Sequence, residues 1–365
     1  MKIAIIGIRG IPVIYSGYET FARYLAEHLS ENNQVYAYCR SPYVDGKNKS
    51  YKKINLVTIP TIKNKNFETF IHSLLSTIHS IIFVRPDVIY YLGVGNALFT
   101  FLPRLFGTKT FINVDGLDWK REKWGMVGRF YLRASQYLAT VLPSITITDS
   151  LYMEKYYLDH YGKKTVYIPY AFEEKLLTLG KDVEDGVLKK YQLERKKYFV
   201  WVGRIVPDNH LEDLINAFKK LKTDFRCVFL GDDPYGSNYK NRVLKMAKED
   251  HRIVMTGFVD RRTVAILVRN AVCYVETKRS NGTHPSLIEG MGLCDNVVAY
   301  NIRANKYVIG NENYLYKNRG QLLTVLKRIT KERINRTINN SNKNLFKKKF
   351  NFEEITFCYE KLLMD

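Results

Sequence analysis

The feature that most restricts the fold of this chain is a regular alternation of short β-branched runs with amphipathic helical stretches. The run KIAIIG (2–7) predicts a strand, and YETFARYLAEHL (18–29) predicts a helix with one apolar face. Further strand-like runs are QVYAYC, INLVTI, DVIYYLG, KTFINVD and SITITDS, separated by helical stretches near 67–82, 97–106, 126–140 and 151–161. Such alternation predicts a parallel, doubly wound sheet.

The pattern restarts after a charged connecting stretch, LGKDVEDGVLKKYQLERKK. New strand-like runs extend from YFVWVG (198–203) to NVVAY (296–300), and 365 residues are enough for two domains. We therefore predict an α/β chain of two Rossmann-like doubly wound domains, residues 1–175 and 190–345, that face each other across a cleft. FEEITFCYEKLLM predicts a C-terminal helix, residues 350–365, that packs back on the first domain.

Cysteine usage and hydropathy give a prediction about the compartment. The five cysteines are scattered and form no CxxC pair, which is typical of a reducing cytoplasm and argues against a zinc site or a disulfide framework. The chain opens without a signal-peptide pattern, and its apolar runs are too short to span a bilayer. We expect a cytoplasmic protein that is soluble or peripheral on a membrane.

The net charge of +21 indicates an anionic partner. Residues 1–170 carry 21 Lys and Arg against 12 Asp and Glu, and residues 317–349 carry 11 basic residues against the single acid Glu332. Such a field favours nucleotide phosphates, nucleic acid or anionic lipid. A lysine-rich surface without a specific partner is the alternative.

Two turns that follow predicted strands are candidate anion sites. In GIRGIPVIYSGYET (7–20) the glycines permit a bent backbone before a helix, but the pattern is not G-x-G-x-x-G, so a plain tight turn is equally consistent. Arg204 follows the strand-like run FVWVG, where doubly wound sheets bind ligands, and its guanidinium suits a pyrophosphate. A surface salt bridge is the alternative for Arg204.

The stretch SNGTHPSLIEGMG (280–292) has two interpretations. Ser286 and Glu289 fit a capping box, S-x-x-E, which needs no ligand. The same loop and helix start also fit an anion site, in which Glu289 accepts hydrogen bonds from ribose hydroxyls.

These segments carry a family resemblance. GRIVPDN, TGF (256–258) and NGTHPSLIEGMG resemble the nucleotide-sugar half of retaining glycosyltransferases of family 4, which have the GT-B fold. GIRGIP, SGYETFARYLAEHL and above all NVDGLDWKREKW (113–124) resemble a bacterial subgroup that includes rhamnosyltransferases of capsule and cell-wall polysaccharide assembly. The likeness extends from residue 1 to about residue 310.

The resemblance implies a donor site. Glu289 matches the residue on the donor ribose, Arg204 the residue on the diphosphate, and the backbone near Phe258 the contact to the base. The chain departs from the family where Asn281 replaces the first of two glutamates. Asn209 and His210 also occupy the position of a frequent lysine, so Arg204 and helix amino termini, or another base such as Lys278 or Arg279, would supply the charge. The predicted donor-binding residues are Gly10, Gly203, Arg204, Phe258, Asn281, Gly282, Thr283, Ser286, Leu287 and Glu289.

The resemblance also implies an acceptor site in the first domain. Asp115 stands where the family often has a histidine, and it is expected either to orient or deprotonate the acceptor or to stabilise a turn before Gly116. The predicted catalytic residues are Asp115, Arg204 and Glu289. The predicted acceptor-binding residues are Arg9, Gly17, Glu19, Asp115, Trp119, Lys120 and Arg121. Since no D-x-D motif follows a strand, we expect no obligatory metal.

The aromatic and basic block around Trp119 suits a membrane interface or a lipid diphosphate, with an ordinary core-packed helix as the alternative. Together these features predict a peripheral enzyme on the inner face of the cell membrane. It would transfer L-rhamnose from dTDP-L-rhamnose, with retention, to a polyprenyl-diphosphate-linked saccharide, without a nucleic-acid partner. The alternatives are a UDP- or GDP-sugar donor, a UDP-N-acetylhexosamine epimerase, or a basic nucleic-acid-binding protein.

Overall fold

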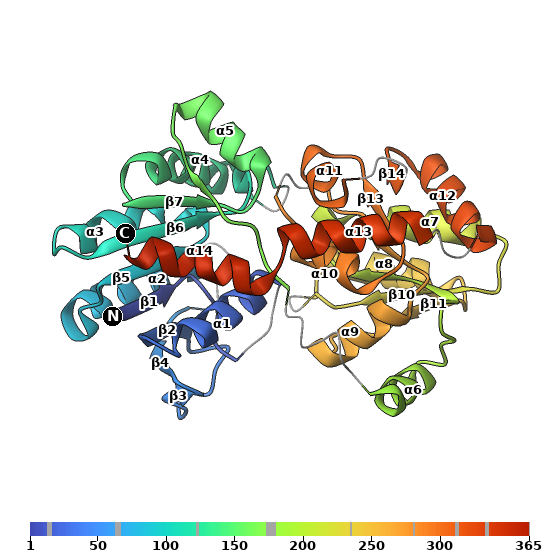
Figure 1. The fold of residues 1–365 in the computed structure, drawn as a ribbon, viewed down its shortest axis with the longest axis horizontal. Helices are drawn as coiled ribbons and strands as arrows, with labels where there is room; N and C mark the ends of the chain where they lie inside the picture. Colours follow the sequence, from blue (N-terminus) through green and yellow to red (C-terminus); the bar gives the residue numbers. More distant parts are fainter. Residues whose placement is uncertain are drawn as a thin grey trace. The chain divides into compact units, whose positions relative to one another are not determined.

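The chain forms two compact units in the computed structural model (Figure 1). The first unit contains Met1–Tyr170 and Glu353–Asp365, and the second contains Ala171–Phe352. The structure describes residues 1–12, 17–62, 67–121, 124–172, 180–233, 236–279, 282–310, 314–332 and 336–364.

The first unit is built on an eight-stranded sheet of order β3-β4-β2-β1-β5-β6-β7-β8. All neighbouring pairs are parallel except β3 with β4. The first strand in the chain, β1, lies between β2 and β5, so the carboxyl end of β1 is the point where the strand order reverses. The strands are β1 (Lys2–Ile6), β2 (Gln34–Arg40), β3 (Ser50–Tyr51), β4 (Ile54–Ile59), β5 (Val88–Leu92), β6 (Lys109–Val114), β7 (Ile145–Thr148) and β8 (Val166–Tyr167).

Helices cover both faces of this sheet. One face packs against a buried cluster that includes Ile89 and Ile112 from the strands and Leu132 from a helix. On the opposite face, the ring of Phe21 lies 5.3 Å from that of Tyr170. The helices are α1 (Gly17–Leu29), α2 (Glu68–His79) with its π-helical extension η1 (Ser80–Val84), η2 (Val94–Thr100), α3 (Phe101–Arg104), η3 (Asp118–Lys120), α4 (Met126–Val141), α5 (Leu151–Tyr161) and α14 (Phe352–Met364).

The C-terminal helix α14 belongs to the first unit. The hydroxyls of Tyr359 on α14 and Tyr90 on β5 are 3.0 Å apart in the buried interior. His28 Nε2 on α1 lies 3.1 Å from Glu360 Oε1. These contacts attach the last helix to strands and helices from the start of the chain.

The second unit contains a six-stranded parallel sheet of order β11-β10-β9-β12-β13-β14. Its first strand, β9, lies between β10 and β12, so this sheet also reverses its order at its first strand. The strands are β9 (Tyr198–Val202), β10 (Arg226–Leu230), β11 (Ile253–Met255), β12 (Cys273–Glu276), β13 (Val297–Tyr300) and β14 (Leu315–Tyr316). The helices are α6 (Lys181–Lys190), η5 (Pro207–Asn209), α7 (Leu211–Lys219), α8 (Asn238–Lys248), α9 (Arg261–Asn270), α10 (Pro285–Leu293), α11 (Arg303–Ile309), α12 (Arg319–Glu332) and α13 (Arg336–Lys349).

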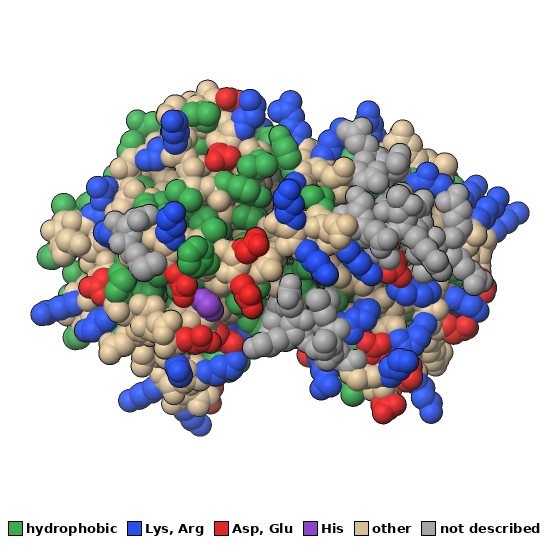
Figure 2. Space-filling view, viewed as in Figure 1, with side chains coloured by type: hydrophobic (Ala, Val, Ile, Leu, Met, Phe, Trp, Pro, Cys, Tyr) green, Lys and Arg blue, Asp and Glu red, His purple; other side chains and the backbone are tan. Residues whose placement is uncertain are grey.

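The prediction of two doubly wound parallel domains is confirmed, with local differences. The single helix expected near 97–106 is instead the 3-10 helix η2 followed by the one-turn helix α3. Pro103 explains the break, because it has no N–H to bond the carbonyl four residues earlier. The basic stretch 317–349 falls on α12 and α13, and Figure 2 shows Lys and Arg side chains outnumbering Asp and Glu on the face drawn. Among the described residues, no helix is both long and apolar enough to cross a membrane.

Candidate functional site

At the carboxyl end of β9 in the second unit, the turns after β9 and β10 pack closely against each other. A side chain at Gly203 would put its Cβ 2.8 Å from Trp201 Cη2 and 3.2 Å from Lys278 Cε. Gly231, at the end of β10, has φ +127°, and a Cβ there would overlap the carbonyl oxygen of Gly203. Both positions therefore require glycine.

Arg204 stands on a turn that Asn209 fixes. Asn209 Nδ2 donates to the carbonyl of Arg204 at 2.6 Å, and the hydroxyl of Thr277 donates to the carbonyl of Asn209. Asn209 is buried, so the residue in place of the family's lysine holds the loop and adds no charge. The predicted donor residues Gly203 and Arg204 are thus carried on a well-braced turn at the switch point.

The start of α10 contradicts the capping-box interpretation of Ser286 and Glu289. The N-cap of α10 is His284, without a side-chain capping bond, and Pro285 occupies the first helical turn. Because proline is favoured at that position, the helix starts two residues earlier than a Ser286 cap would require. Ser286 Oγ instead accepts a hydrogen bond from Lys278 Nζ at 2.6 Å.

Glu289 is held by an arginine from the neighbouring helix. Arg261 Nη1, at the start of α9, donates to Glu289 Oε2 at 2.8 Å, and both side chains are largely buried. Asp260 caps α9 by accepting from the amide of Thr263 at 3.0 Å, which fixes the first turn that carries Arg261. The carboxylate therefore has a set orientation, with Arg261 on one of its oxygens.

A buried ion pair beside this turn was not predicted from the sequence. Glu276, at the end of β12, is fully buried, and its Oε2 lies 3.2 Å from Lys278 Nζ and 3.1 Å from the hydroxyl of Tyr274. Burial alone would raise the pKa of the Glu276 carboxyl, but the charges of Lys278 and His284 and hydrogen bonds from Lys278 lower that pKa below its usual value. Lys278 Nζ also donates to the carbonyl of Val202 at 3.3 Å. A fixed ammonium thus lies between the end of β9 and the first turn of α10.

The two basic residues that follow β12, Lys278 and Arg279, lie in different surroundings. Arg279 bonds the carboxylate of Asp213 on α7, and its guanidinium lies 4.3 Å from the ring centre of Tyr300. Of the two bases that follow β12, Lys278 is therefore the one beside Gly203. A Glu-x-Lys pair at the end of a strand was the sequence signal for this pair.

The remaining predicted donor residues have different environments. Phe258 follows Gly257, whose carbonyl accepts from the amide of Gly231 at 2.9 Å, and the Phe258 ring is 67% exposed. Leu287 is fully buried in the interior, Thr283 is buried, and Asn281 lies outside the described residues. Gly282, which follows Asn281, begins the next described segment.

In the first unit, Glu19 ties the glycine turn after β1 to the start of α1. Glu19 Oε1 accepts from the backbone amide of Arg9 at 3.0 Å and from Arg9 Nη1 at 3.3 Å. A side chain at Gly10 would overlap Val44, so this turn is also closely packed. The predicted acceptor residues Arg9 and Glu19 come together as an ion pair, and Gly17 begins the helix.

Asp115 follows β6 at the carboxyl edge of the same sheet. Burial, with a contribution from the nearby Asp118 carboxylate, raises the pKa of Asp115 to about 6. The hydroxyl of Tyr170 lies 3.5 Å from Asp115 Oδ2. A carboxyl group that titrates near neutral pH can exchange a proton with a bound hydroxyl.

The other predicted acceptor residues, Trp119, Lys120 and Arg121, form a corner of the chain that packs against α4. Trp119 Nε1 donates to Gln136 Oε1 at 2.8 Å, and the cationic groups of Lys120 and Arg133 lie 5.2 and 5.4 Å from the centre of the indole ring. Arg121 Nη1 lies 3.4 Å from Asp118 Oδ1. Two cationic groups thus lie near the indole ring while its N–H is held by Gln136.

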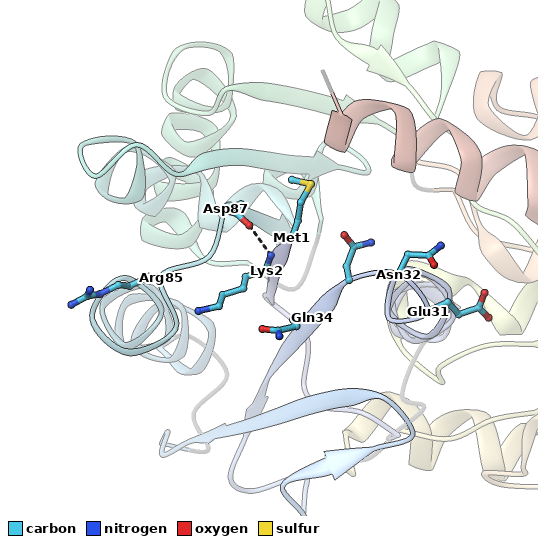
Figure 3. A pocket seen from close by; sticks show the side chains of 8 residues that line it. Met1, Lys2, Glu31, Asn32, Gln34, Arg85 and Asp87 are labelled. Carbon is cyan, nitrogen blue, oxygen red and sulfur yellow. Dashed lines mark hydrogen bonds between the residues drawn. The ribbon is translucent and has the colours of Figure 1, made fainter.

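An open hollow in the first unit lies at the opposite edge of the sheet from these residues (Figure 3). It is lined by Met1, Lys2, Gln34, Arg85 and Asp87, and the amide of Lys2 donates to Asp87 Oδ2 at 2.7 Å. Ligands of doubly wound sheets bind at the carboxyl ends of the strands, so this hollow at the amino ends is not the candidate site. Among the described residues, no group of three or more His, Cys, Asp or Glu side chains could hold a metal ion.

Comparisons with known family models find a match for each half of the chain. Residues 187–344 match the family model of glycosyl transferases group 1, and residues 1–173 match a domain of unknown function, DUF1972. No curated protein matches the sequence significantly.

Solved structures match both domains together. A sucrose-phosphate synthase from Thermosynechococcus elongatus is 18% identical, with a TM-score of 0.81 over 99% of this chain and 98% of that one. HepE from Anabaena in complex with UDP-glucose is 16% identical, with a TM-score of 0.79 over 100% and 99%. An E. coli trehalose-6-phosphate protein bound with UDP-2-fluoro glucose is 9% identical, with a TM-score of 0.74 over 100% and 99%. At these identities the likeness establishes a shared fold.

Two parallel-sheet domains of this type, with the second matching a transferase model, define a glycosyltransferase of the GT-B fold. The match to glycosyl transferases group 1 covers its second domain, residues 187–344.

Proposed function

We propose that this glycosyltransferase takes its sugar from a nucleotide-sugar donor held in the second domain. The observation that carries the proposal is the group at the start of α10, where Lys278 lies against Ser286 and the end of β9. The amino end of a helix and a fixed ammonium both attract a diphosphate. The solved structures of HepE with UDP-glucose and of the E. coli protein with UDP-2-fluoro glucose support a donor of this class.

Each donor contact has a residue suited to it. Arg204 and Lys278 provide positive charge for the diphosphate, and Glu289, oriented by Arg261, provides an acceptor for ribose hydroxyls. During transfer the bond from the anomeric carbon to the diphosphate oxygen breaks, and the diphosphate leaves with that electron pair. Fixed cations stabilise the charge that develops on it, while the acceptor oxygen bonds to the same face of the sugar, giving retention.

Asp115 is the proposed contact to the acceptor hydroxyl. Its carboxyl, with a pKa near 6, orients that hydroxyl, and the departing phosphate takes the hydroxyl proton. The GT-B epimerase alternative would require a set of acid and base groups around the sugar. The proposed transfer needs only Asp115, with its hydrogen-bond partner Tyr170, to orient the acceptor hydroxyl.

We further propose that the donor is dTDP-L-rhamnose and that the acceptor is a saccharide on a polyprenyl diphosphate, at the inner face of the cell membrane. This assignment rests on the resemblance of NVDGLDWKREKW to rhamnosyltransferases of polysaccharide assembly. Trp119, with two cationic groups within 5.4 Å of its ring centre, is suited to a lipid diphosphate.

Thermal unfolding in the presence of nucleotides tests the donor proposal. A ligand at 100 times its Kd stabilises the native state by about 2.7 kcal/mol. We expect dTDP and dTDP-L-rhamnose to raise the melting temperature of the wild type, and Glu289→Gln to reduce the shift. Glu194→Gln, at an exposed surface carboxylate, should keep the full shift and serves as the control. A shift with UDP or GDP alone would exclude the rhamnose donor, and the absence of any nucleotide shift would exclude the donor site.

A further inference from the structure

The outward side of α4 in the first unit is an apolar surface with arginines and without acids. Met126, Val127 and Phe130 are 86%, 83% and 77% exposed, and Tyr137 is 56% exposed. The spacing of 126, 130, 133, 137 and 141 puts Met126, Phe130, Arg133, Tyr137 and Val141 on one stripe of the helix. Apart from Arg133 this stripe is apolar or aromatic, and monomeric soluble proteins rarely expose a large apolar patch.

A neighbouring element extends this surface. Arg104, at the end of α3, donates through Nη1 to the carbonyl of Leu142 at 2.6 Å, so the end of α3 touches the end of α4. Leu105 and Phe106, which follow Arg104, are 72% and 68% exposed. We call the exposed side chains of Leu105, Phe106, Met126, Val127, Phe130 and Tyr137, with Arg104, Arg129 and Arg133, the α3–α4 face.

Charge decides which partner fits this face. The segments that form it, residues 101–107 and 124–142, contain no Asp or Glu, while Arg104, Arg129 and Arg133 are exposed. A symmetric contact between two copies would bring these arginines together with no carboxylate from the face to pair with them. An anionic lipid bilayer provides both an apolar phase for the aromatic and aliphatic side chains and phosphates for the arginines.

We propose that the α3–α4 face docks on an anionic bilayer and so presents the acceptor site to its lipid-linked substrate. The exposed amino-terminal half of α4 directly follows the corner that carries Trp119, and Trp119 is bonded to Gln136 of the same helix. A bilayer on this face therefore lies beside the corner predicted to bind the lipid diphosphate. The choice of a lipid acceptor rests on the proposed function, whereas the docking itself does not.

Flotation of the full chain with vesicles tests the proposal. We expect binding to vesicles of phosphatidylglycerol and phosphatidylcholine that exceeds binding to phosphatidylcholine alone and weakens with salt. The double variant Met126→Glu/Phe130→Glu should bind at least about tenfold more weakly. Two apolar side chains that enter the bilayer on docking are lost, and two negative charges face the anionic lipid. Arg129→Gln should weaken binding about fivefold at low salt.

The control is Phe357→Glu, at an exposed phenylalanine on α14, which should bind vesicles like the wild type. The proposal is overturned if the wild type does not float with anionic vesicles, or if the double variant floats equally well. It is also overturned if sedimentation shows a wild-type dimer that the double variant abolishes, since the occupant is then a second copy. Nucleotide-induced stabilisation, measured on the same variants, should be unchanged, so failure of docking and failure of the donor site give different results.

Discussion

Replacing Lys278 by methionine tests the ion pair that lies at the centre of the proposed donor site. In the variant, the fully buried Glu276 carboxylate keeps its hydrogen bonds from the hydroxyls of Tyr274 and Ser286 and from the amide of residue 278. It loses the ammonium at 3.2 Å. Breaking a buried pair from one side costs about 3–5 kcal/mol. Because three donors remain, we expect the lower end, about 3 kcal/mol of the free energy of unfolding.

The pH dependence gives the sign of the effect. In the wild type the pKa of Glu276 lies below its usual value of 4.5, so the stability from this carboxylate is present above about pH 4.5 and is lost as the pH falls through the folded-state pKa. Without Lys278, burial dominates and raises that pKa. The variant is then penalised most at high pH, where the buried group must be charged, and the penalty shrinks on acidification.

Urea unfolding of the wild type and Lys278→Met at pH 8 and pH 5 measures this directly. The stability difference should be about 3 kcal/mol at pH 8 and clearly smaller at pH 5. Lys248→Met, at an exposed lysine on α8, should change stability by less than about 0.5 kcal/mol at both values. The double variant Glu276→Gln/Lys278→Met should cost less than the sum of the single changes. A difference below about 1 kcal/mol, or one that is the same at both pH values, would refute the reasoning.

Two further changes follow from the same structure. Asp115→Asn should lower kcat by about 100-fold or more and remove the rise of activity near pH 6. Tyr170→Phe should move that rise to higher pH, because the Tyr170 hydrogen bond lowers the pKa of Asp115. pH–rate profiles would show both effects, and an unchanged profile in Asp115→Asn would exclude a role of Asp115 in the reaction. Gly231→Ala should destabilise the second domain by more than about 1–3 kcal/mol in urea unfolding, because its φ of +127° and the carbonyl of Gly203 leave no room for a Cβ. Gly186→Ala, with no atom near its Cβ position in helix α6, should be neutral or stabilising by up to about 1 kcal/mol, and equal costs at the two glycines would contradict this account.

The layout of the sheets was predictable because hydrophobic periodicity is a local property of the chain. The runs KIAIIG and YFVWVG became the first strands of the two sheets, β1 and β9. The two-residue strand β3 was missed, because so short a strand has no period to detect. The broken helix near 97–106 was also missed, although Pro103 was the available signal.

The site was harder to predict because its contacts join residues that are distant in sequence. Arg261 and Glu289 belong to different helices, and Asp115 meets Tyr170 across 55 positions. The Glu276–Lys278 pair was missed because its burial depends on the whole second sheet. The capping box was wrong because Pro285 decides where α10 begins.

The central claim is that the second domain binds a nucleotide sugar and the enzyme transfers its sugar to a lipid-linked acceptor. The most direct measurement is the release of nucleoside diphosphate and the transfer of labelled sugar from dTDP-L-rhamnose to a polyprenyl-diphosphate saccharide in anionic vesicles. We predict that dTDP is released in step with label entering the lipid fraction, and that Glu289→Gln reduces both while Glu194→Gln does not. The account would be contradicted if sugar were transferred neither from dTDP-L-rhamnose nor from any UDP- or GDP-sugar.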